Sequence, residues 1–195
     1  MYQSATNNES RSTLPPNVCI EDTTFEWTDS LNTYLLTNLW VRDFIMIFNA
    51  FWFDFTLCAL LLLFRENHLP SSTPFLALMI SDGCKTIIQS SYMTVGRLDG
   101  FNYYFPGLYS LIVPYHDIYD FYYSGHFATS AVLICALYSL AKRHPQVTVY
   151  HILLVAWIAF KLPYIWLYMT AVRTHYLIDF TSGICFGLLA FRFAE

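Results

Sequence analysis

Long apolar runs alternate with short polar connections along most of the chain. After a polar stretch that ends near residue 40, five runs approach the roughly 20 residues that a helix needs to cross the hydrocarbon core of a bilayer. They cover residues 44–64, 75–95, 127–141, 147–170 and 176–193. This pattern predicts an all-α integral membrane protein, with a bundle of five transmembrane helices in residues 41–195 and a polar N-terminal tail in residues 1–40.

Residues 96–123 connect the second run to the third and contain many aromatic side chains. Gly100, Pro106, Gly107 and Pro114 interrupt any long helix there. Tyrosines and phenylalanines of this kind suit the membrane interface or a re-entrant segment above a site. A crossing by this stretch would make six helices.

Composition supports a membrane protein and excludes some partners. Of the 195 residues, 56% are hydrophobic and 12% are charged, whereas soluble domains carry about 25% charged residues. The net charge of −4 provides no basic surface for nucleic acid. Membrane lipids are therefore the expected partners.

Two polar clusters each stand at the start of an apolar run. Residues 120–126 read Asp-Phe-Tyr-Tyr-Ser-Gly-His and precede the third run, and residues 173–179 read Arg-Thr-His-Tyr-Leu-Ile-Asp and open the fifth. Two crossings separate the clusters along the chain. By parity, both clusters are expected on the same side of the membrane.

The residue types in these clusters suit phosphoryl chemistry. His175 and Asp179 are four residues apart, so on a helix they share a face and the carboxylate can orient the imidazole. His126 follows Ser124 and Gly125 at an expected helix N-terminus, where backbone N–H groups bind anions. A nucleophile, an orienting carboxylate, a proton donor and an anion site are thus all available.

The paired motifs resemble those of the sphingomyelin-synthase-like branch of the phosphatidic acid phosphatase type 2 superfamily. The resemblance implies that His175 attacks phosphorus, that Asp179 orients it and that His126 protonates the leaving group. The chain departs from the family pattern at Leu177, where a hydroxyl residue is usual, and at residues 118–119, where Ile-Tyr replaces Cys-Gly. The upstream Lys/Arg-Pro phosphate motif of the wider superfamily is absent.

Several further residues are candidates for binding substrate. Ser124 and Gly125 would offer donors to phosphate, and Arg173 would be a bidentate clamp. Asp120 either shapes the site or caps the following helix. Two histidines and a carboxylate could instead bind a metal as a facial triad, but Ser-Gly and arginine favour an anion. We therefore expect no metal and no organic cofactor.

Charged residues inside the apolar runs require partners, because an ionised group in the bilayer core is costly. Asp54 lies near the middle of the first run and Lys85 near the middle of the second. A hairpin of the two helices predicts an ion pair between them, with Asp82 as a competitor for the lysine. Lys161 has no evident partner, and it is expected to snorkel, to face the site or to face another subunit.

Basic residues predict the orientation of the bundle. Arg65, Lys142, Arg143 and Arg192 fall on the side opposite the two motifs. The positive-inside rule then places the motifs on the exoplasmic face. The organelle stays open between the secretory pathway and the mitochondrial inner membrane.

Two functions agree with these patterns. One is an integral-membrane lipid phosphatase or lipid head-group phosphotransferase that uses His126, His175 and Asp179. The other is a non-catalytic structural or lipid-binding subunit of a larger membrane complex, for example in the mitochondrial inner membrane. Such a subunit would bind its neighbours through the N-terminal tail and the face that carries Lys161.

Overall fold

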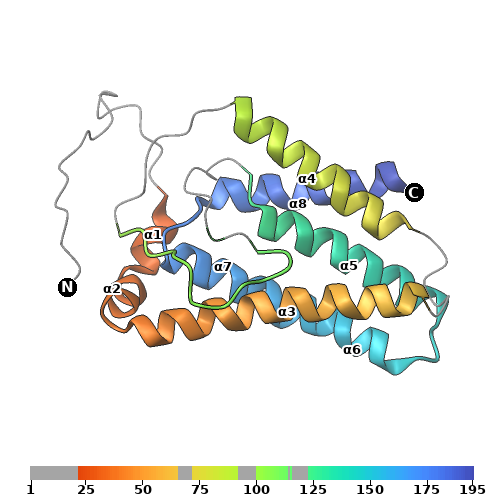
Figure 1. Ribbon diagram of the computed structural model, residues 1–195, viewed down its shortest axis with the longest axis horizontal. Helices are drawn as coiled ribbons and strands as arrows, with labels where there is room; N and C mark the ends of the chain where they lie inside the picture. Colours follow the sequence, from red (N-terminus) through yellow and green to blue (C-terminus); the bar gives the residue numbers. More distant parts are fainter. Residues whose placement is uncertain (1–21, 66–71, 92–99, 114, 116–122) are drawn as a thin grey trace.

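The computed structural model describes residues 22–65, 72–91, 100–113, 115 and 123–195. Throughout these ranges the chain is helical between connections, without any β-strand (Figure 1). The predicted all-α bundle is therefore confirmed. In chain order the helices are α1 (Thr23–Trp27), α2 (Asp29–Thr37), α3 (Leu39–Arg65), α4 (Thr73–Ser91), α5 (Gly125–Arg143), α6 (Thr148–Ala156), the π-helix η1 (Trp157–Lys161), α7 (Leu162–Ala171) and α8 (Leu177–Ala194).

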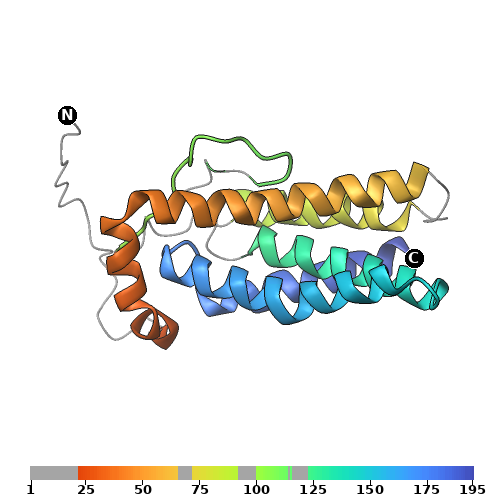
Figure 2. The same cartoon turned by 90° about the horizontal axis from the view of Figure 1, so that it is seen from below.

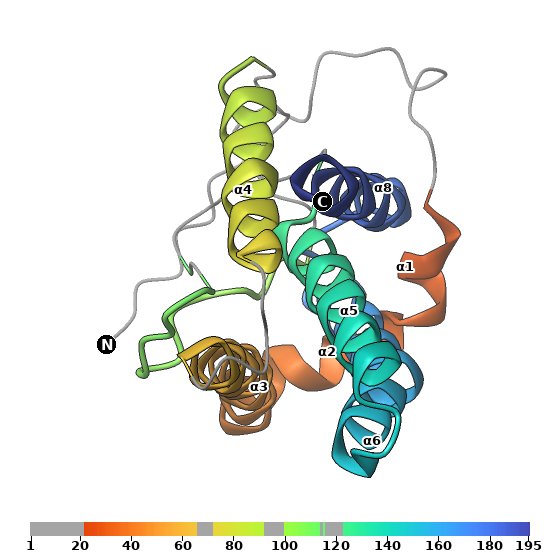
Figure 3. The same ribbon diagram turned by 90° about the vertical axis from the view of Figure 1, so that its right-hand side faces the viewer.

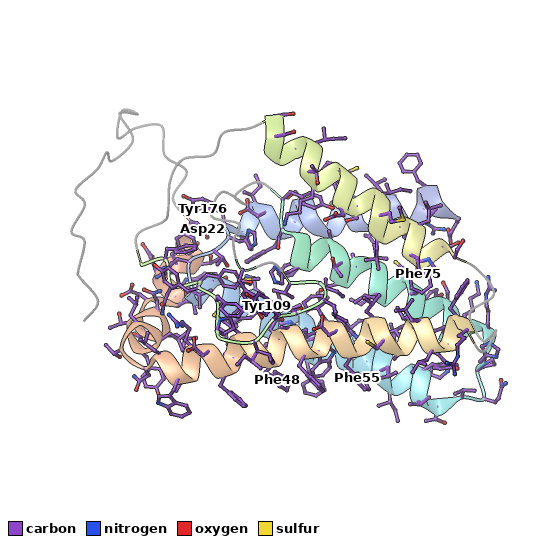
Figure 4. The ribbon with its side chains drawn as sticks, viewed as in Figure 1. Asp22, Phe48, Phe55, Phe75, Tyr109 and Tyr176 are labelled. Atoms are coloured by element: carbon purple, nitrogen blue, oxygen red, sulfur yellow. The ribbon has the colours of Figure 1, made fainter. Side chains whose placement is uncertain are left out.

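Among the described residues, three helical stretches are long and apolar enough to cross a membrane. They are Leu39–Arg65, Thr148–Ala171 and Leu177–Ala194. Each leaves most of its apolar surface exposed, and Figure 4 shows Phe48 and Phe55 projecting from α3. The two other predicted spans, α4 and α5, are 19 residues long. Polar side chains make them less apolar than the other three, since α4 carries Asp82 and Lys85 within its length.

α5 is the central helix of the bundle. It packs against α4, α6, α7 and α8, as the end-on view shows (Figure 3). Its contact with α8 is close because two glycines of α8 face it. A Cβ atom at Gly183 would lie 2.5 Å from the carbonyl oxygen of Ser124, and one at Gly187 would overlap the carbonyl oxygen of Ala128. Small residues at such spacing let two helix backbones approach closely.

The register of α5 and α8 determines where the two motifs lie. Ser124 N donates to the carbonyl oxygen of Asp179 (3.1 Å). Gly183 lies against Ser124, and Gly187 lies against Ala128 one helical turn further along both helices. The two helices therefore run in the same direction. His126 and His175 consequently lie close together, near the starts of α5 and α8.

The helix that precedes α8 contains a π turn. Residues 157–161 form η1 between α6 and α7, and Pro163 lies at the start of α7. Proline has no N–H to donate to the preceding turn, which disturbs the regular ladder of the helix. The irregularity before this proline is a single π turn, a feature that is frequent near functional sites.

The polar N-terminal segment is folded from Asp22 onwards, which differs from the tail predicted up to residue 40. The Asp22 carboxylate caps α1 by accepting from Thr24 N (3.0 Å). Asn32 in α2 donates to the carbonyl oxygens of Gly100 (2.8 Å) and Ala171 (2.6 Å). These polar contacts, with the fully buried Leu35, attach α1 and α2 to the site end of the bundle.

Candidate active site

The turn between α7 and α8 positions His175. Arg173 in this turn has a positive φ of 57°, and Thr174 N donates back to the carbonyl oxygen of Met169 (3.1 Å). This geometry ends α7 and directs the chain into α8. His175 is consequently buried, with only 2% of its surface exposed.

Asp179 holds both the imidazole of His175 and the start of α8. Its Oδ2 atom lies 3.4 Å from His175 Nδ1 and accepts a hydrogen bond from Tyr176 N at 2.9 Å. The carboxylate is completely buried. Since Nδ1 faces the carboxylate, Nε2 is the nitrogen of His175 that is available for chemistry.

His126 comes to the same place from α5. Its ring centroid lies 6.4 Å from that of His175, and the ring planes are inclined by 70°. Phe53 of α3 and Tyr103 of the 100–113 segment flank the His126 ring, at 5.7 Å and 6.5 Å between centroids. Two imidazoles at this separation can both contact one tetrahedral group.

Two polar atoms at this site are buried without a hydrogen-bond partner in the described structure. They are Ser124 Oγ and His126 Nε2. Ser124 occupies the N-cap position of α5, yet its hydroxyl does not cap the helix. Buried polar atoms nearly always have partners, and leaving one unpaired costs about 1–3 kcal/mol. Both atoms are therefore well placed to bind a polar ligand.

Lys85, which the sequence assigned to an ion pair with Asp54, lies at this candidate site instead. A Cβ atom at Gly125 would lie 3.3 Å from Lys85 Nζ, so the ammonium lies against the first residue of α5. There it adds a positive charge to the positive end of the helix dipole. Only the packing of α4 onto α5 and α8 brings it there, and no local sequence pattern reports that packing.

The ion pair expected between Asp54 and Lys85 is not formed. Asp54 instead accepts hydrogen bonds from Ser110 Oγ (2.8 Å) and from Leu111 N (3.0 Å). The physical reason is that α4 packs against α8 and α5 rather than along α3 as a hairpin.

Arg173 does not act as the predicted phosphate clamp. Its Nη1 atom donates to Thr28 Oγ1 (2.9 Å) and its Nη2 atom to the carbonyl oxygen of Phe25 (2.7 Å). Asp29 lies 3.3 Å away, and the guanidinium stacks over the Phe25 ring at 4.6 Å. Burial lowers the pKa of Arg173 below its usual value, and the charge of Asp29 opposes this shift. The guanidinium thus attaches the turn before His175 to α1 and α2.

A second contact secures the start of α8. Asp22 Oδ2 accepts from Leu177 N at 2.6 Å, and the Phe25 ring lies 5.4 Å from that of Tyr176. Figure 4 shows Asp22 and Tyr176 side by side at this end of the molecule. The N-terminal segment is thereby part of the support of His175.

Lys161 points into the bundle rather than towards another subunit, and 1% of its surface is exposed. Its ammonium donates to Asn49 Oδ1 (2.6 Å) and to the carbonyl oxygen of Asn49 (3.1 Å). It also lies 4.8 Å from the centroid of Phe53, the ring that flanks His126.

Of the other candidates, Asp120 lies outside the described residues. Within the described ranges, no group of three or more His, Cys, Asp and Glu side chains is arranged to hold a metal ion. The alternative of a facial triad on His126, His175 and Asp179 thus gains no support. The ammonium of Lys85 beside Gly125 favours an anion over a cation.

Comparison with protein-family models, with curated proteins and with solved structures gives no match for this chain. A functional conclusion therefore depends on the two motifs and on the geometry around His126 and His175.

Proposed function

We propose that this protein is an integral-membrane lipid phosphatase or lipid head-group phosphotransferase, with a bundle of five transmembrane helices. The observation that carries the proposal is the convergence of the two motifs. His126 lies beside the His175–Asp179 pair, and the partnerless Ser124 Oγ and His126 Nε2 belong to the same site. This arrangement agrees with the resemblance to the sphingomyelin-synthase-like branch of the phosphatidic acid phosphatases.

In the proposed mechanism, His175 Nε2 attacks the phosphorus of a lipid phosphate ester. A P–N bond forms and the P–O bond to the leaving group breaks, while His126 gives its proton to the departing oxygen. Asp179 stabilises the positive charge that develops on the His175 ring. In the second step, water or a lipid hydroxyl such as that of ceramide attacks the phosphohistidine, and His126 takes the proton of the incoming group.

Charge at the site supports an anionic transition state. Lys85 and the first N–H groups of α5 can neutralise the phosphate oxygens, and Ser124 Oγ can donate to one of them. A preorganised cation in a site without bulk water interacts far more strongly than it would in solution. Lys85 would replace Arg173 as the cation of the site.

Basic residues support an exoplasmic position for the site. α5 ends with Lys142 and Arg143, and α8 has Arg192 in its last turn, all at the end opposite the histidines. Under the positive-inside rule this end faces the cytoplasm or the mitochondrial matrix.

Purified protein in lipid nanodiscs would test the proposal with two assays. One follows hydrolysis of a fluorescent short-chain lipid phosphate, and the other supplies ceramide with a phospholipid donor. We expect His175→Ala to abolish turnover and the phosphohistidine. His126→Ala should retain more activity on esters with good leaving groups than on alkyl esters, because it loses only the proton donor.

His151→Ala, which alters an exposed histidine on α6, is the matched control. Equal inactivity of wild type and all variants in both assays would contradict the proposal.

A second candidate is a non-catalytic structural or lipid-binding subunit of a membrane complex. The use of Arg173 as a structural anchor favours it, since the expected phosphate clamp is occupied elsewhere. Native purification distinguishes the two functions. Elution only as part of a complex, without turnover, would favour the subunit.

A further inference from the structure

Residues 101–113 form an uncharged, non-helical segment beside α3. Its sequence is Phe-Asn-Tyr-Tyr-Phe-Pro-Gly-Leu-Tyr-Ser-Leu-Ile-Val. Figures 1 and 2 show it running alongside α3 towards the middle of that helix. Several large side chains on its outer side are exposed: Tyr104, Leu108, Tyr109 and Leu111. Exposed apolar side chains with no charge among them form a surface that water does not favour.

The turn of this segment is held by an acidic side chain of α3. Asp54 accepts from Ser110 Oγ (2.8 Å) and, through both oxygens, from Leu111 N (3.0 and 3.1 Å). Ser110 Oγ accepts in turn from Ile112 N (3.2 Å) and Val113 N (2.9 Å). Three consecutive backbone N–H groups thus have acceptors although the segment is not helical. Non-helical backbone is tolerated at membrane depth only where it is buried in protein or lines a water-filled cavity, and here Asp54 holds the backbone of the turn against α3.

The position of Asp54 along α3 determines the depth of this turn. α3 has 27 residues and is about 40 Å long, whereas the hydrocarbon core needs about 20 residues. Any 20 consecutive residues of α3 include Asp54, at least four residues from either end. If α3 crosses the membrane, as in the proposed function, the Ser110–Leu111 turn lies beside hydrocarbon.

The inner side of the same segment reaches the catalytic histidines. Tyr103 is 6% exposed, and its ring lies 6.5 Å from that of His126 and 5.7 Å from that of Tyr115. Asn102 N donates to the carbonyl oxygen of Val172 (2.9 Å), which attaches the start of the segment to the turn before His175. The segment therefore stands between His126 and the lipid.

We propose that residues 101–113 are a re-entrant loop whose outer side chains contact the acyl chains of membrane lipid, and that a lipid substrate reaches His126 along this face. The proposal rests on the proposed function and deepens it, because it adds the route by which a bilayer-embedded lipid reaches His126. Asp54 is the residue that keeps the loop at this depth.

Spin labelling tests the depth of the loop without any need for turnover. Leu111→Cys is labelled with a nitroxide in an otherwise cysteine-free chain in nanodiscs, and its accessibility to oxygen and to a water-soluble nickel chelate is compared. Phe51→Cys on the exposed side of α3 is the reference for hydrocarbon, and Glu26→Cys on α1 is the reference for water. We expect the label at residue 111 to match the one at residue 51. A label at residue 111 that matches residue 26 would overturn the proposal.

Removing the carboxylate tests the role of Asp54. In the Leu111→Cys protein, Asp54→Ala should make the label more mobile and more accessible to the nickel chelate. Ser110→Ala is a milder variant that removes one of the donors, and it should shift the label in the same direction if Asp54→Ala does not fold. An unchanged label in both variants would refute the role of Asp54.

A chain-length comparison tests the route of the substrate. Leu111→Ser should raise KM for a long-chain lipid phosphate in bilayers by about tenfold, the equivalent of one lost apolar side-chain contact. It should leave KM for a short-chain soluble phosphate and both kcat values nearly unchanged. Equal effects on both substrates would overturn the route.

The spin-label and activity results together separate the two proposals. A label at residue 111 that lies in hydrocarbon, in a protein without any turnover, would support the loop and contradict only the proposed enzymatic function.

Discussion

At the scale of single residues, the buried carboxylate beside His175 has two tasks that substitution can separate. Asp179 Oδ2 accepts from Tyr176 N and faces His175 Nδ1. Asparagine can keep the hydrogen bond to Tyr176 through its carbonyl oxygen but carries no charge. We expect Asp179→Asn to fold and to lower kcat on the order of 10²- to 10⁴-fold, as loss of the orienting carboxylate does in hydrolase triads. Single-turnover kinetics with a thermal melt would check this, and an unchanged kcat would remove Asp179 from the mechanism.

Lys85 provides a second prediction at this scale. Replacing it with methionine preserves the apolar stem against Gly125 but removes the cation. We expect kcat/KM for a lipid phosphate to fall about 10²-fold, with partial recovery in Lys85→Arg, because a preorganised charge stabilises the transferring phosphoryl group. Lys142→Met, at the exposed far end of α5, is the matched control. Equal activity of the two methionine variants would show that Lys85 is not part of the site.

The candidate site could be predicted only in part from the sequence. His126, His175 and Asp179 were identified because their signal is local: a one-turn spacing and a small-residue pair before a helix. The position of Lys85 at the site was not predicted, because it depends on which helices pack together. Arg173 was assigned to phosphate because its partners in α1 and α2 are about 145 residues away along the chain, and no pattern near it reports them.

At the scale of elements, the close contact of α5 with α8 keeps the two motifs together. A Cβ atom at Gly187 would overlap the carbonyl oxygen of Ala128 and lie 2.9 Å from Ala131 Cβ, whereas one at Gly83 on α4 would meet nothing within 4 Å. We expect Gly187→Ala to destabilise the protein by about 1–3 kcal/mol and to lower activity as His126 and His175 move apart. Gly83→Ala should be neutral or stabilise by up to about 1 kcal/mol, since alanine is the better helix former.

Thermal unfolding in one detergent, followed by assay of both glycine variants, would check this pair. The comparison is direct because each variant adds a single methyl group to a helical glycine. Equal melting temperatures would show that α5 and α8 tolerate a wider separation than their glycines indicate.

The lengths of the apolar runs predicted the long helices well, but they did not predict the remaining elements. The five runs correspond to α3, α4, α5, the α6–α7 stretch and α8, because burial and length leave a direct record in hydropathy. The short helices α1 and α2 contain no long apolar run that would predict them. They are polar, and tertiary hydrogen bonds such as those of Asn32 hold them in place. The packing of α4 against α8 could not be predicted either. Hydropathy indicates which segments are apolar, but it does not indicate which helices contact each other.

At the scale of the whole molecule, the helices divide the surface into two ends and an apolar belt. α1 and α2 lie at one end, and the C-terminal ends of α3, α5 and α8 lie at the other (Figure 1). Folding of residues 22–38 onto the site end removes one argument for an accessory subunit, because these residues contact their own domain. The exposed belt along α3 and α8 is what lipid would cover in the proposed placement.

This division predicts which residues reagents can reach from each side of the membrane. Glu26 is exposed on α1 at the site end, and Lys142 is exposed at the opposite end of α5. In sealed microsomes, whose cytoplasmic face points outward, we expect an impermeant maleimide to label Lys142→Cys in a cysteine-free chain at once. It should label Glu26→Cys only after detergent is added, because the motifs are proposed to be exoplasmic. The opposite result would reverse the orientation while retaining the span. Labelling of both residues in intact microsomes would place the two ends on one side and contradict the transmembrane bundle itself.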